Sequence, residues 1–393
     1  MISTINNTRI IILTLILSFT LHLSVQSQDF QNLTYGTDST LDVVTWNIEW
    51  FPKDGNTTIG YVTDIIDALE ADVIAIQEID DISSFEDVVD GLPDYEGYLE
   101  SSYFAGLAYI YNTETVTIND IYEIYTTSPY WSAFPRSPMV MDLEYNGERV
   151  IIINNHFKCC GDGTMNLNDP DDQETRRYYA SNYLKEYIDT HFDEERVIVT
   201  GDLNDILTDS YSNNVFRNIM ADDDNYYFAD IDIAEGDEED WSYPGWPSHL
   251  DHLLITDELF EEVETGSVTT IKVEDHMSGG WWAYEEHVSD HRPVGIRLDV
   301  DGATGINNTE PELAFTVSPN PVKSSTTFTF DKTTEPTILE IFNLQGKVVF
   351  SAEVESGSST ICWAPDGLDA GTYLAKVTDG KNGVKVKKVL VLR

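Results

Sequence analysis

Residues 196–205 read R-V-I-V-T-G-D-L-N-D, and this stretch decides the fold. Three β-branched residues in a row, Val197 to Val199, are typical of a buried strand, and Gly201 interrupts the run. Asp202 and Asn204 follow with one residue between them, so in an extended chain their side chains point to the same side. The pattern predicts a carboxylate and a carboxamide at the C-terminal end of a core strand, where open α/β sheets place their chemistry.

Five other apolar runs carry polar side chains of the same kinds at one end. These side chains are Asn47, Glu49, Glu78, His156, Asp251, Asp290 and His291. A single motif of this kind also forms ordinary turns, so the weight of the pattern comes from its repetition. We expect separate strands to bring these side chains together at one rim of the fold.

The order of the elements predicts an α/β domain. Apolar residues recur at helical spacing in residues 60–70 and 172–190, and each stretch leads into a buried strand. The turn at Asn146-Gly147 predicts a pair of neighbouring strands. The expected strands are residues 41–50, 72–78, 107–111, 116–125, 134–142, 149–158, 196–205, 249–256, 263–273 and 289–300, and residues 277–286 are expected to form a Gly- and Trp-rich loop.

The charge of the chain is strongly negative and unevenly distributed. The sequence has 70 acidic and 22 basic residues, a formal net charge of -48. Residues 1–300 contain 59 of the acids and 13 of the bases, whereas residues 301–393 are nearly neutral. Such an acidic body should repel polyanions at long range, and it lacks the basic footprint of a typical nucleic-acid-binding domain.

The three cysteines, Cys159, Cys160 and Cys362, form neither a disulfide framework nor a zinc-binding spacing. The adjacent pair is compatible with a strained vicinal disulfide or with two reduced, partly buried thiols. Trp281-Trp282 is either an aromatic lid over substrate or ordinary loop packing. His252 follows Asp251 and should point to the opposite face, as a structural residue. The histidines without motif support, which we expect at the surface, are His249, His276 and His287.

The two ends of the chain differ from its central part. The N-terminal end is typical of an export signal, and the C-terminal end of a small separate domain. Residues 1–27 are typical of a signal peptide, with Arg9 before an apolar run and small residues before Gln28. A membrane anchor is the alternative, although the run is short for a span. Residues 301–311 are a Gly/Asn/Thr linker, and the short alternating strands in residues 312–393 predict an all-β, immunoglobulin-like sandwich. We therefore expect a secreted or cell-surface protein.

The polar side chains at the strand ends are mostly oxygen ligands, without thiolate. Such ligands favour a hard divalent cation, Mg²⁺ first, with Mn²⁺ or Ca²⁺ possible. A hard cation among carboxylates suits attack of water on phosphorus, because it neutralises phosphate charge while an Asp orients water and a His moves a proton.

The motifs W-N-I, Q-E, N-x-H-x-K, G-D-x-N, L-D-H and S-D-H occur in this order over about residues 41–300. This series resembles the endonuclease/exonuclease/phosphatase superfamily, which includes DNase I-like nucleases and bacterial sphingomyelinases. The resemblance implies a catalytic domain over residues 28–300. It also implies a four-layer α/β sandwich, in which two mixed sheets pack face to face with helices outside.

The resemblance also implies how the metal is held. By position, Asn47 and Glu78 would bind the cation, with Asp290 close by. Glu49 matches a position that some members use for a second cation.

Roles in catalysis follow from the same correspondence. Asp202 and Asn204 would position the attacking water and the phosphate. His291, oriented by Asp251, would act as general base or as electrostatic partner of the phosphoryl group. His156 would contact the phosphate or protonate the leaving oxygen.

Substrate contacts are expected from basic residues near the motifs. Arg136, in F-P-R-S-P, is similar to the substrate-contacting arginine of DNase I-like members. Lys158 and Arg177 are the other candidates. With Arg176 they would form a local positive pocket in a negative protein.

The tail resembles the type A C-terminal sorting domain of the type IX secretion pathway. The resemblance rests on S-P-N-P at residues 318–321, N-L-Q-G-K at residues 343–347, G-T-Y-L at residues 371–374 and a Lys-rich last strand. It implies the type IX machinery as a partner and removal of the tail after export. A carbohydrate-binding sandwich is the alternative, although its strand faces would need more clustered aromatic residues.

Together these features predict a secreted, metal-dependent phosphoesterase that acts as a monomer on phosphodiester bonds. An extracellular nuclease acting on DNA or RNA is the first interpretation. A sphingomyelinase-like or other lipid or small-molecule phosphodiesterase or phosphatase is the alternative, because it would tolerate the negative charge. A non-catalytic surface binding protein is the second alternative, which would require a broken motif, and none is broken.

Overall fold

The computed structural model describes residues 30, 32–99, 106–300, 315–330, 337–343, 346–354, 360–365, 367–379 and 384–392. The expected signal peptide and the expected linker lie outside the described residues. Within the described part of the chain, none of the helices has both the length and the apolar character needed to cross a membrane.

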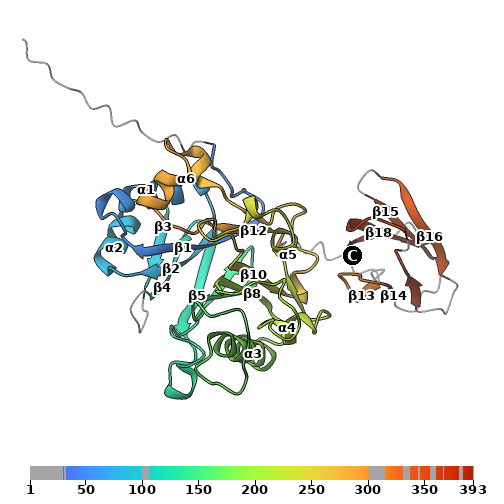
Figure 1. Ribbon diagram of the computed structural model, residues 1–393. Coiled ribbons are helices and arrows are strands. Elements are labelled where there is room, and N and C mark those ends of the chain that lie inside the picture. Colours follow the sequence, from blue (N-terminus) through green and yellow to red (C-terminus); the bar gives the residue numbers. More distant parts are fainter. Residues whose placement is uncertain are drawn as a thin grey trace, which may run out of the picture.

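Two mixed sheets of six strands form the N-terminal part of the molecule (Figure 1). The first has the order β11-β12-β1-β2-β4-β3. Its strands are β1 (Leu41–Phe51), β2 (Val73–Ile79), β3 (Tyr95–Tyr98), β4 (Gly106–Asn112), β11 (Thr269–Thr270) and β12 (Val294–Leu298). The second has the order β5-β6-β7-β8-β10-β9. Its strands are β5 (Val116–Glu123), β6 (Met139–Tyr145), β7 (Glu148–His156), β8 (Arg196–Asp202), β9 (Tyr226–Phe228) and β10 (Asp251–Thr256).

Successive residues of a strand point to opposite faces of its sheet, and in the central strands both sets are apolar. One face of each sheet therefore packs against the other sheet. In β1, Val43 points into the core between the sheets, whereas Val44 points to the outer face. In β8, Ile198 lies in the same central core, and Val197 and Val199 lie on the opposite face. Residues buried on both faces explain why these strands read as continuous apolar runs.

Helices cover both outer faces and complete four layers, as the sequence predicted (Figure 1). Residues of α1 (Asn56–Leu69), α2 (Ile82–Asp90) and α6 (Trp281–His287) pack on the first sheet, and α3 (Gln173–His191) and α4 (Arg217–Met220) pack on the second. The remaining short turns of helix are α5 (Ile231–Ala234), η1 (Ser128–Tyr130), η2 (Glu238–Asp240), η3 (Asp257–Leu259) and η4 (Val273–His276).

Four of the expected elements differ from the structure. The expected strand at residues 289–300 is reduced to β12, Val294–Leu298. The expected loop at residues 277–286 contains most of helix α6, which begins after Gly280 at φ 60°. The expected strand at residues 263–273 is reduced to the two residues of β11. Strand β6 begins only at Met139, because Pro135 and Pro138 cannot donate to a strand ladder.

The C-terminal part is all-β, as expected. A three-stranded sheet has the order β13-β14-β17 and packs against a four-stranded sheet of order β16-β15-β18-β19 around a shared apolar core. The strands are β13 (Phe315–Ser318), β14 (Thr326–Phe330), β15 (Thr337–Asn343), β16 (Val348–Val354), β17 (Thr360–Trp363), β18 (Gly371–Asp379) and β19 (Val384–Val391). Strand β17 was not predicted from the sequence, and neither were β3, β9 and α2 of the N-terminal part.

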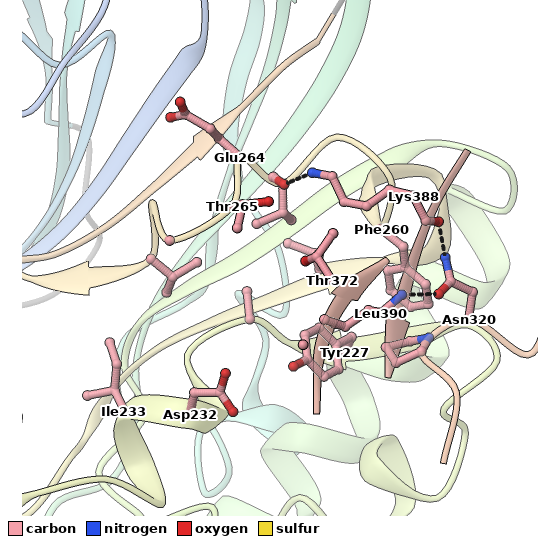
Figure 2. Close-up of a pocket in the computed structure, with 17 residues that line it drawn as sticks. Tyr227, Asp232, Ile233, Phe260, Glu264, Thr265, Asn320, Thr372, Lys388 and Leu390 are labelled. Carbon is pink, nitrogen blue, oxygen red and sulfur yellow. Dashed lines mark hydrogen bonds between the residues drawn. The ribbon is translucent and has the colours of Figure 1, made fainter. Parts of the chain in front are cut away.

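The last strand of this part contacts the N-terminal part (Figure 2). Lys388 on β19 donates a hydrogen bond to the carbonyl oxygen of Val263. Its own carbonyl oxygen accepts from Asn320 Nδ2 at 3.1 Å. A cavity of about 320 Å³ lies between the two parts, with Tyr227 and Phe260 on one side and Leu390 on the other.

Candidate active site

Strand register places three of the expected site residues side by side. In the parallel pair β7–β8, His156 lies opposite Asp202. In the antiparallel pair β8–β10, Asp251 lies opposite the same Asp202. Asn47 of the first sheet reaches across and donates from Nδ2 to Asp202 Oδ2 at 3.0 Å. The two sheets therefore meet at one rim, as the repeated motifs predicted.

A cavity of about 360 Å³ opens at this rim. Its walls carry four carboxylates, two imidazoles, two thiols and three large aromatic side chains. The lining residues are Glu49, Trp50, Glu78, His156, Cys159, Cys160, Asp202, Asn204, Tyr243, Trp246, Ser248, Leu250, Asp290 and His291. No Lys or Arg is among these lining residues, although Arg136 and Lys158 are close enough to act electrostatically on His156.

Backbone strain is concentrated around the cavity. Nine non-glycine residues of the described chain have positive φ, a conformation that costs free energy for residues with a side chain. Five of these nine line the cavity, and they are Glu49, Trp50, Glu78, Cys160 and Asn204. Strained residues cluster at active and binding sites, so the backbone points to this cavity independently of any motif.

Glu78 and Asp290 form the carboxylate side of the cavity. Glu78 is fixed by the amide of Trp50, which donates to Oε2 at 2.9 Å, and by Asn47 Nδ2, 3.4 Å from Oε1. Burial raises the pKa of Asp290 to about 6, although His291 opposes the shift. Gathered carboxylates fit a hard divalent cation, for which oxygen atoms are the preferred ligands.

Glu49 has a different environment. It forms an ion pair with Lys53, whose ammonium also donates to the carbonyl oxygen of Glu285. Its Oε2 accepts from the amide of Asp290 at 2.9 Å. Because Lys53 already neutralises Glu49, this carboxylate holds the loop that carries Asp290 and is poorly suited to a second cation.

Both ring nitrogens of His291 face carboxylates of the site, which fixes the orientation of the ring. Its Nδ1 lies 2.7 Å from Asp251 Oδ2, and its Nε2 lies 3.9 Å from Asp202 Oδ2. Burial opposes protonation, but the carboxylates of Asp251 and Asp202 outweigh it and raise the pKa of His291 to about 10. Ser289 fixes this segment, since its hydroxyl donates to the Asn47 carbonyl oxygen at 2.6 Å and accepts from the His291 amide at 3.0 Å.

His156 and Asp202 form the centre of the site. His156 Nε2 lies 3.5 Å from Asp202 Oδ2 and 3.8 Å from Glu78 Oε1. Burial, aided by the positive charge of Arg136, holds the pKa of His156 well below its usual range. Burial raises the pKa of Asp202 to about 7 against the opposing effect of His291. Asn204 closes the loop, because its amide donates to Asp202 Oδ1 at 3.0 Å.

The three basic residues expected to contact substrate differ in burial and in the groups that they already contact. Arg136 is partly buried and close enough to influence His156 electrostatically. Lys158 Nζ contacts Cys159, 3.1 Å from its carbonyl oxygen and 3.2 Å from its sulfur. Arg177 is only 3% exposed and is committed to Asp205 and to backbone carbonyls, so it cannot meet a substrate.

Several residues of this region were not predicted, or were predicted elsewhere. Tyr243 packs its ring 4.7 Å from that of His291, and Trp50 and Trp246 stand at the cavity mouth, 50% and 78% exposed. Tyr243 and Trp246 lie in an acidic, loop-rich segment without periodicity, and Trp50 is an ordinary residue of strand β1 in the pattern. Trp281-Trp282 does not line the cavity, since Trp281 packs against the core. His249 is buried, not at the surface as expected.

The family can now be stated. The profile of the endonuclease/exonuclease/phosphatase family matches residues 44–291, which is most of the chain, so the chain belongs to this family. The profile of the secretion system C-terminal sorting domain matches residues 316–392, which implies export to the cell surface or the extracellular space. A search of curated proteins found no match.

Three similar solved structures have low sequence identity to this chain. D. rerio TDP2 in complex with a single-strand DNA product has a TM-score of 0.51 at 13% identity, over 66% of this chain and 99% of that one. The human nocturnin catalytic domain with bound sulfate has a TM-score of 0.49 at 15% identity, over 66% and 94%. An endonuclease/exonuclease/phosphatase from Bacteroides vulgatus has 0.47 at 16%, over 66% and 98%. Of these three, the first has a TM-score above 0.5. At 13% identity it supports the fold of the chain and does not by itself indicate a function.

Proposed function

We propose that this protein is an exported, divalent-metal-dependent phosphodiesterase, and that its substrate is nucleic acid. The observation that carries the proposal is the position of Asp202, between His156 and the Asp251-oriented His291, in a cavity whose other wall holds Glu78 and Asp290. This arrangement supplies a carboxylate for water, two imidazoles for a phosphoryl group and a separate oxygen-rich cation site.

The cation site would consist of Asn47, Glu78 and Asp290, and Mg²⁺ is the ion that suits their oxygen ligands best, with Mn²⁺ or Ca²⁺ as substitutes. When bound, the cation neutralises phosphate charge and so makes the phosphorus more open to attack by water. The four carboxylates that line the cavity outnumber its one imidazole with a raised pKa, His291, which supports the presence of a cation in the working enzyme.

Each of the remaining groups has one task. Asp202, held by Asn47 and by the Asn204 amide, orients the attacking water and takes up its proton. His291 presents Nε2 to the phosphoryl group, because Asp251 holds the other ring nitrogen. His156 faces the same oxygen of Asp202 from the neighbouring strand and contacts the phosphate or the leaving oxygen.

A nuclease is preferred as the specific activity. D. rerio TDP2, which is similar to this chain in fold, was solved with a single-strand DNA product. Trp50 and Trp246 are exposed beside the cavity, and exposed aromatic rings are what stacking of bases requires. The second candidate is a lipid or small-molecule phosphodiesterase. It is favoured by the charge of -48, which weakens binding of a polyanion at low salt.

The deciding experiment is a hydrolysis panel with the full chain and Mg²⁺ or Mn²⁺. The substrates are plasmid DNA, RNA, sphingomyelin, inositol phosphates and bis-nitrophenyl phosphate. Turnover of DNA or RNA that disappears in D202N, but persists in the surface control D38N, supports the nuclease. Turnover of sphingomyelin alone supports the second candidate. If neither the wild type nor D38N hydrolyses any phosphoester, the proposal is wrong.

A further inference from the structure

The two adjacent cysteines belong to the wall of the active-site cavity. Strand β7 ends at His156, and the chain continues through Phe157 and Lys158 to Cys159 and Cys160. Both cysteines line the same cavity as His156. A chemical change at this pair would therefore be felt in the cavity, and none of the steps proposed above uses it.

The two sulfur atoms face each other. Cys160 Sγ lies 2.9 Å from Cys159 Sγ, with Cys160 at φ 70°. Cys159 is partly exposed and Cys160 is exposed, so neither serves as a core residue. The third cysteine, Cys362, lies on β17 in the C-terminal part and is exposed. The pair is therefore accessible to reagents and each thiol has the other as its nearest partner in the segment.

The backbone of this segment is held firmly. Arg177 Nη1 donates to the carbonyl oxygens of Lys158 and Cys160, at 2.7 Å each, and Arg177 Nε lies 2.8 Å from Asp205 Oδ2. Gly161, at φ 123°, follows at once and leaves no room for a Cβ beside the Glu174 carboxylate. Helix α3 thus fixes the turn on both sides of Cys160 and keeps the thiols together.

The two thiols are chemically unequal. Lys158 Nζ lies 3.2 Å from Cys159 Sγ. Although burial opposes ionisation, hydrogen bonds from Cys160 and Lys158 outweigh it, and the pKa of Cys159 falls below its usual value. The hydrogen bond to Cys159 raises the pKa of Cys160. Because the thiolate is the nucleophile in disulfide exchange, Cys159 is the attacking group and Cys160 the resolving one.

We propose that Cys159 and Cys160 form a redox site on the wall of the active-site cavity, which disulfide oxidants convert reversibly into a vicinal disulfide. The position of the paired sulfur atoms, the firmly held turn and the unequal environments of the two thiols carry this proposal. The sorting domain supports it, since an exported protein meets oxidising compartments in which disulfides form and persist.

The reaction balances with a small disulfide such as glutathione disulfide as the oxidant. The Cys159 thiolate attacks one sulfur of glutathione disulfide, forms a mixed disulfide and releases one glutathione thiolate. Cys160 then gives its proton to solvent and attacks Cys159 Sγ, which releases the second glutathione. The protein loses two electrons and two protons, and the oxidant gains both as two thiols.

Oxidation changes the charge of the cavity wall. In the reduced form the Cys159 sulfur holds the Lys158 ammonium, and its thiolate adds negative charge to an acidic cavity. In the disulfide this charge is gone and Lys158 keeps only the carbonyl oxygen of Cys159. If the proposed phosphodiesterase activity holds, the oxidised enzyme should bind an anionic substrate more tightly, with KM lower by roughly threefold and kcat little changed.

Peptide mapping tests the redox site without any reference to activity. Trypsin cleaves after Lys158 and Arg176, so both cysteines fall in the single peptide 159–176, without Cys362. The full chain is incubated with glutathione disulfide, alkylated and digested. We expect peptide 159–176 to be lighter by two hydrogen atoms and unalkylated, with both changes reversed by dithiothreitol and retained in the control C362S. Alkylation of both thiols, a stable glutathione adduct, or a link to another chain would overturn the proposal.

Kinetics test the consequence. With the substrate found by the hydrolysis panel, KM is measured for the reduced and oxidised wild type, for C362S and for the double variant C159S/C160S. We expect oxidation to lower KM about threefold in the wild type and in C362S, and to leave the KM of the double variant unchanged. An equal KM in both redox states of the wild type would refute the effect on the cavity. If the panel finds no substrate, the peptide map still decides the redox site, so the two proposals fail separately.

Discussion

The imidazole of His252 donates from Nε2 to the backbone carbonyl oxygen of Asp205, at 2.8 Å, just after the loop that carries Asp202 and Asn204. Its Nδ1 lies 2.6 Å from Asp230 Oδ2. A carbonyl and a carboxylate both accept hydrogen bonds, so both ring nitrogens carry protons and the buried ring is an imidazolium. The loop after β8 is therefore held by a buried ion pair on the face of β10 opposite Asp251.

Asp230, His249 and His252 lie close enough to hold a metal ion, but their hydrogen bonds indicate otherwise. The amide of Ser242 donates to His249 Nδ1 at 3.3 Å, so Nδ1 is an acceptor and the ring proton lies on Nε2. That nitrogen donates to Asp230 Oδ2 at 3.0 Å and has no lone pair for a metal. The group is a hydrogen-bonded anchor and is distinct from the proposed cation site.

The first prediction concerns this anchor. Replacing Asp230 with Asn leaves a buried cation without its partner, so D230N should lower the free energy of unfolding by about 3–5 kcal/mol. Urea unfolding measures the loss, and D232N, two residues away and exposed, is the control. Equal stability of D230N and D232N would show that the ion pair is not formed.

The anchor also gives a pH dependence with a defined sign. The histidines outweigh burial and hold the pKa of Asp230 below its usual range, so its contribution is present above about pH 4 and lost in acid. Asp230 outweighs burial and raises the pKa of His252, so that contribution is complete below about pH 6.5 and is lost as the pH rises through the folded-state pKa. The difference in stability between wild type and D230N should be larger at about pH 6 than at about pH 10.

The second prediction separates two neighbouring arginines. Arg177 is buried against Asp205 and the carbonyl oxygens of the cysteine segment, whereas Arg176 donates to the carbonyl oxygen of Ser132 nearer the surface. R177M should lower the free energy of unfolding by about 3–5 kcal/mol, because it leaves a buried carboxylate unpaired. R176M should change it by less than about 1 kcal/mol. Urea unfolding and hydrogen exchange in residues 158–163 measure both, and equal losses would contradict the assignment.

The sequence predicted the architecture because strand periodicity is a local property. The apolar runs around Val43, Ile198 and Leu253 are long enough to specify buried strands, and their polar ends specify which rim carries the site. The same logic failed for α6, where Gly279 and Gly280 suggested a loop although they only begin the helix. Local composition does not show that Tyr284 of this helix packs into the core.

Contacts between distant segments could not be predicted from spacing. Glu49 accepts from the amide of Asp290 and Lys53 donates to the carbonyl oxygen of Glu285, and no motif indicates either of these contacts. Arg177 follows a helix start like any surface arginine, and its burial depends on Asp205 of another segment. The residues at strand ends were found because each ends an apolar run, whereas those in loops, such as Tyr243, have no such signal.

The third prediction concerns the cation. Mg²⁺ bound only by the folded protein should raise its melting temperature by mass action, and EDTA should remove both this shift and the hydrolysis. E78Q removes one charged ligand and should reduce the shift to a small fraction of the wild-type value. The control is E86Q, an exposed residue of α2, which should keep the full shift. Thermal unfolding at increasing Mg²⁺ measures this, and an undiminished shift in E78Q would place the cation elsewhere.

The fourth prediction is that D202N is inactive but more stable than the wild type in the absence of a divalent cation. Hydrolysis should fall by about 10²–10⁴-fold, since a neutral amide cannot accept the proton of water. Burial raises the pKa of Asp202 to about 7. Ionised Asp202 therefore lowers the free energy of unfolding, beginning above the usual pKa of an aspartate and reaching its full effect once the pH exceeds about 7. Asn carries no charge, so D202N should gain about 2 kcal/mol at pH 8 and almost nothing below about pH 4.

Urea unfolding of wild type and D202N in EDTA at both pH values measures this difference, and activity is measured in parallel with Mg²⁺. The expected pattern is gained stability together with lost turnover, because the same buried charge that serves the reaction costs the fold free energy. The carboxamide oxygen introduced by D202N can still accept from the backbone amide of Asn204, so the loop should keep its shape, although the hydrogen bond from Asn47 Nδ2 to the other oxygen is lost. If D202N is inactive because it unfolds more easily than the wild type, Asp202 is a structural residue and the proposed role in orienting water is wrong.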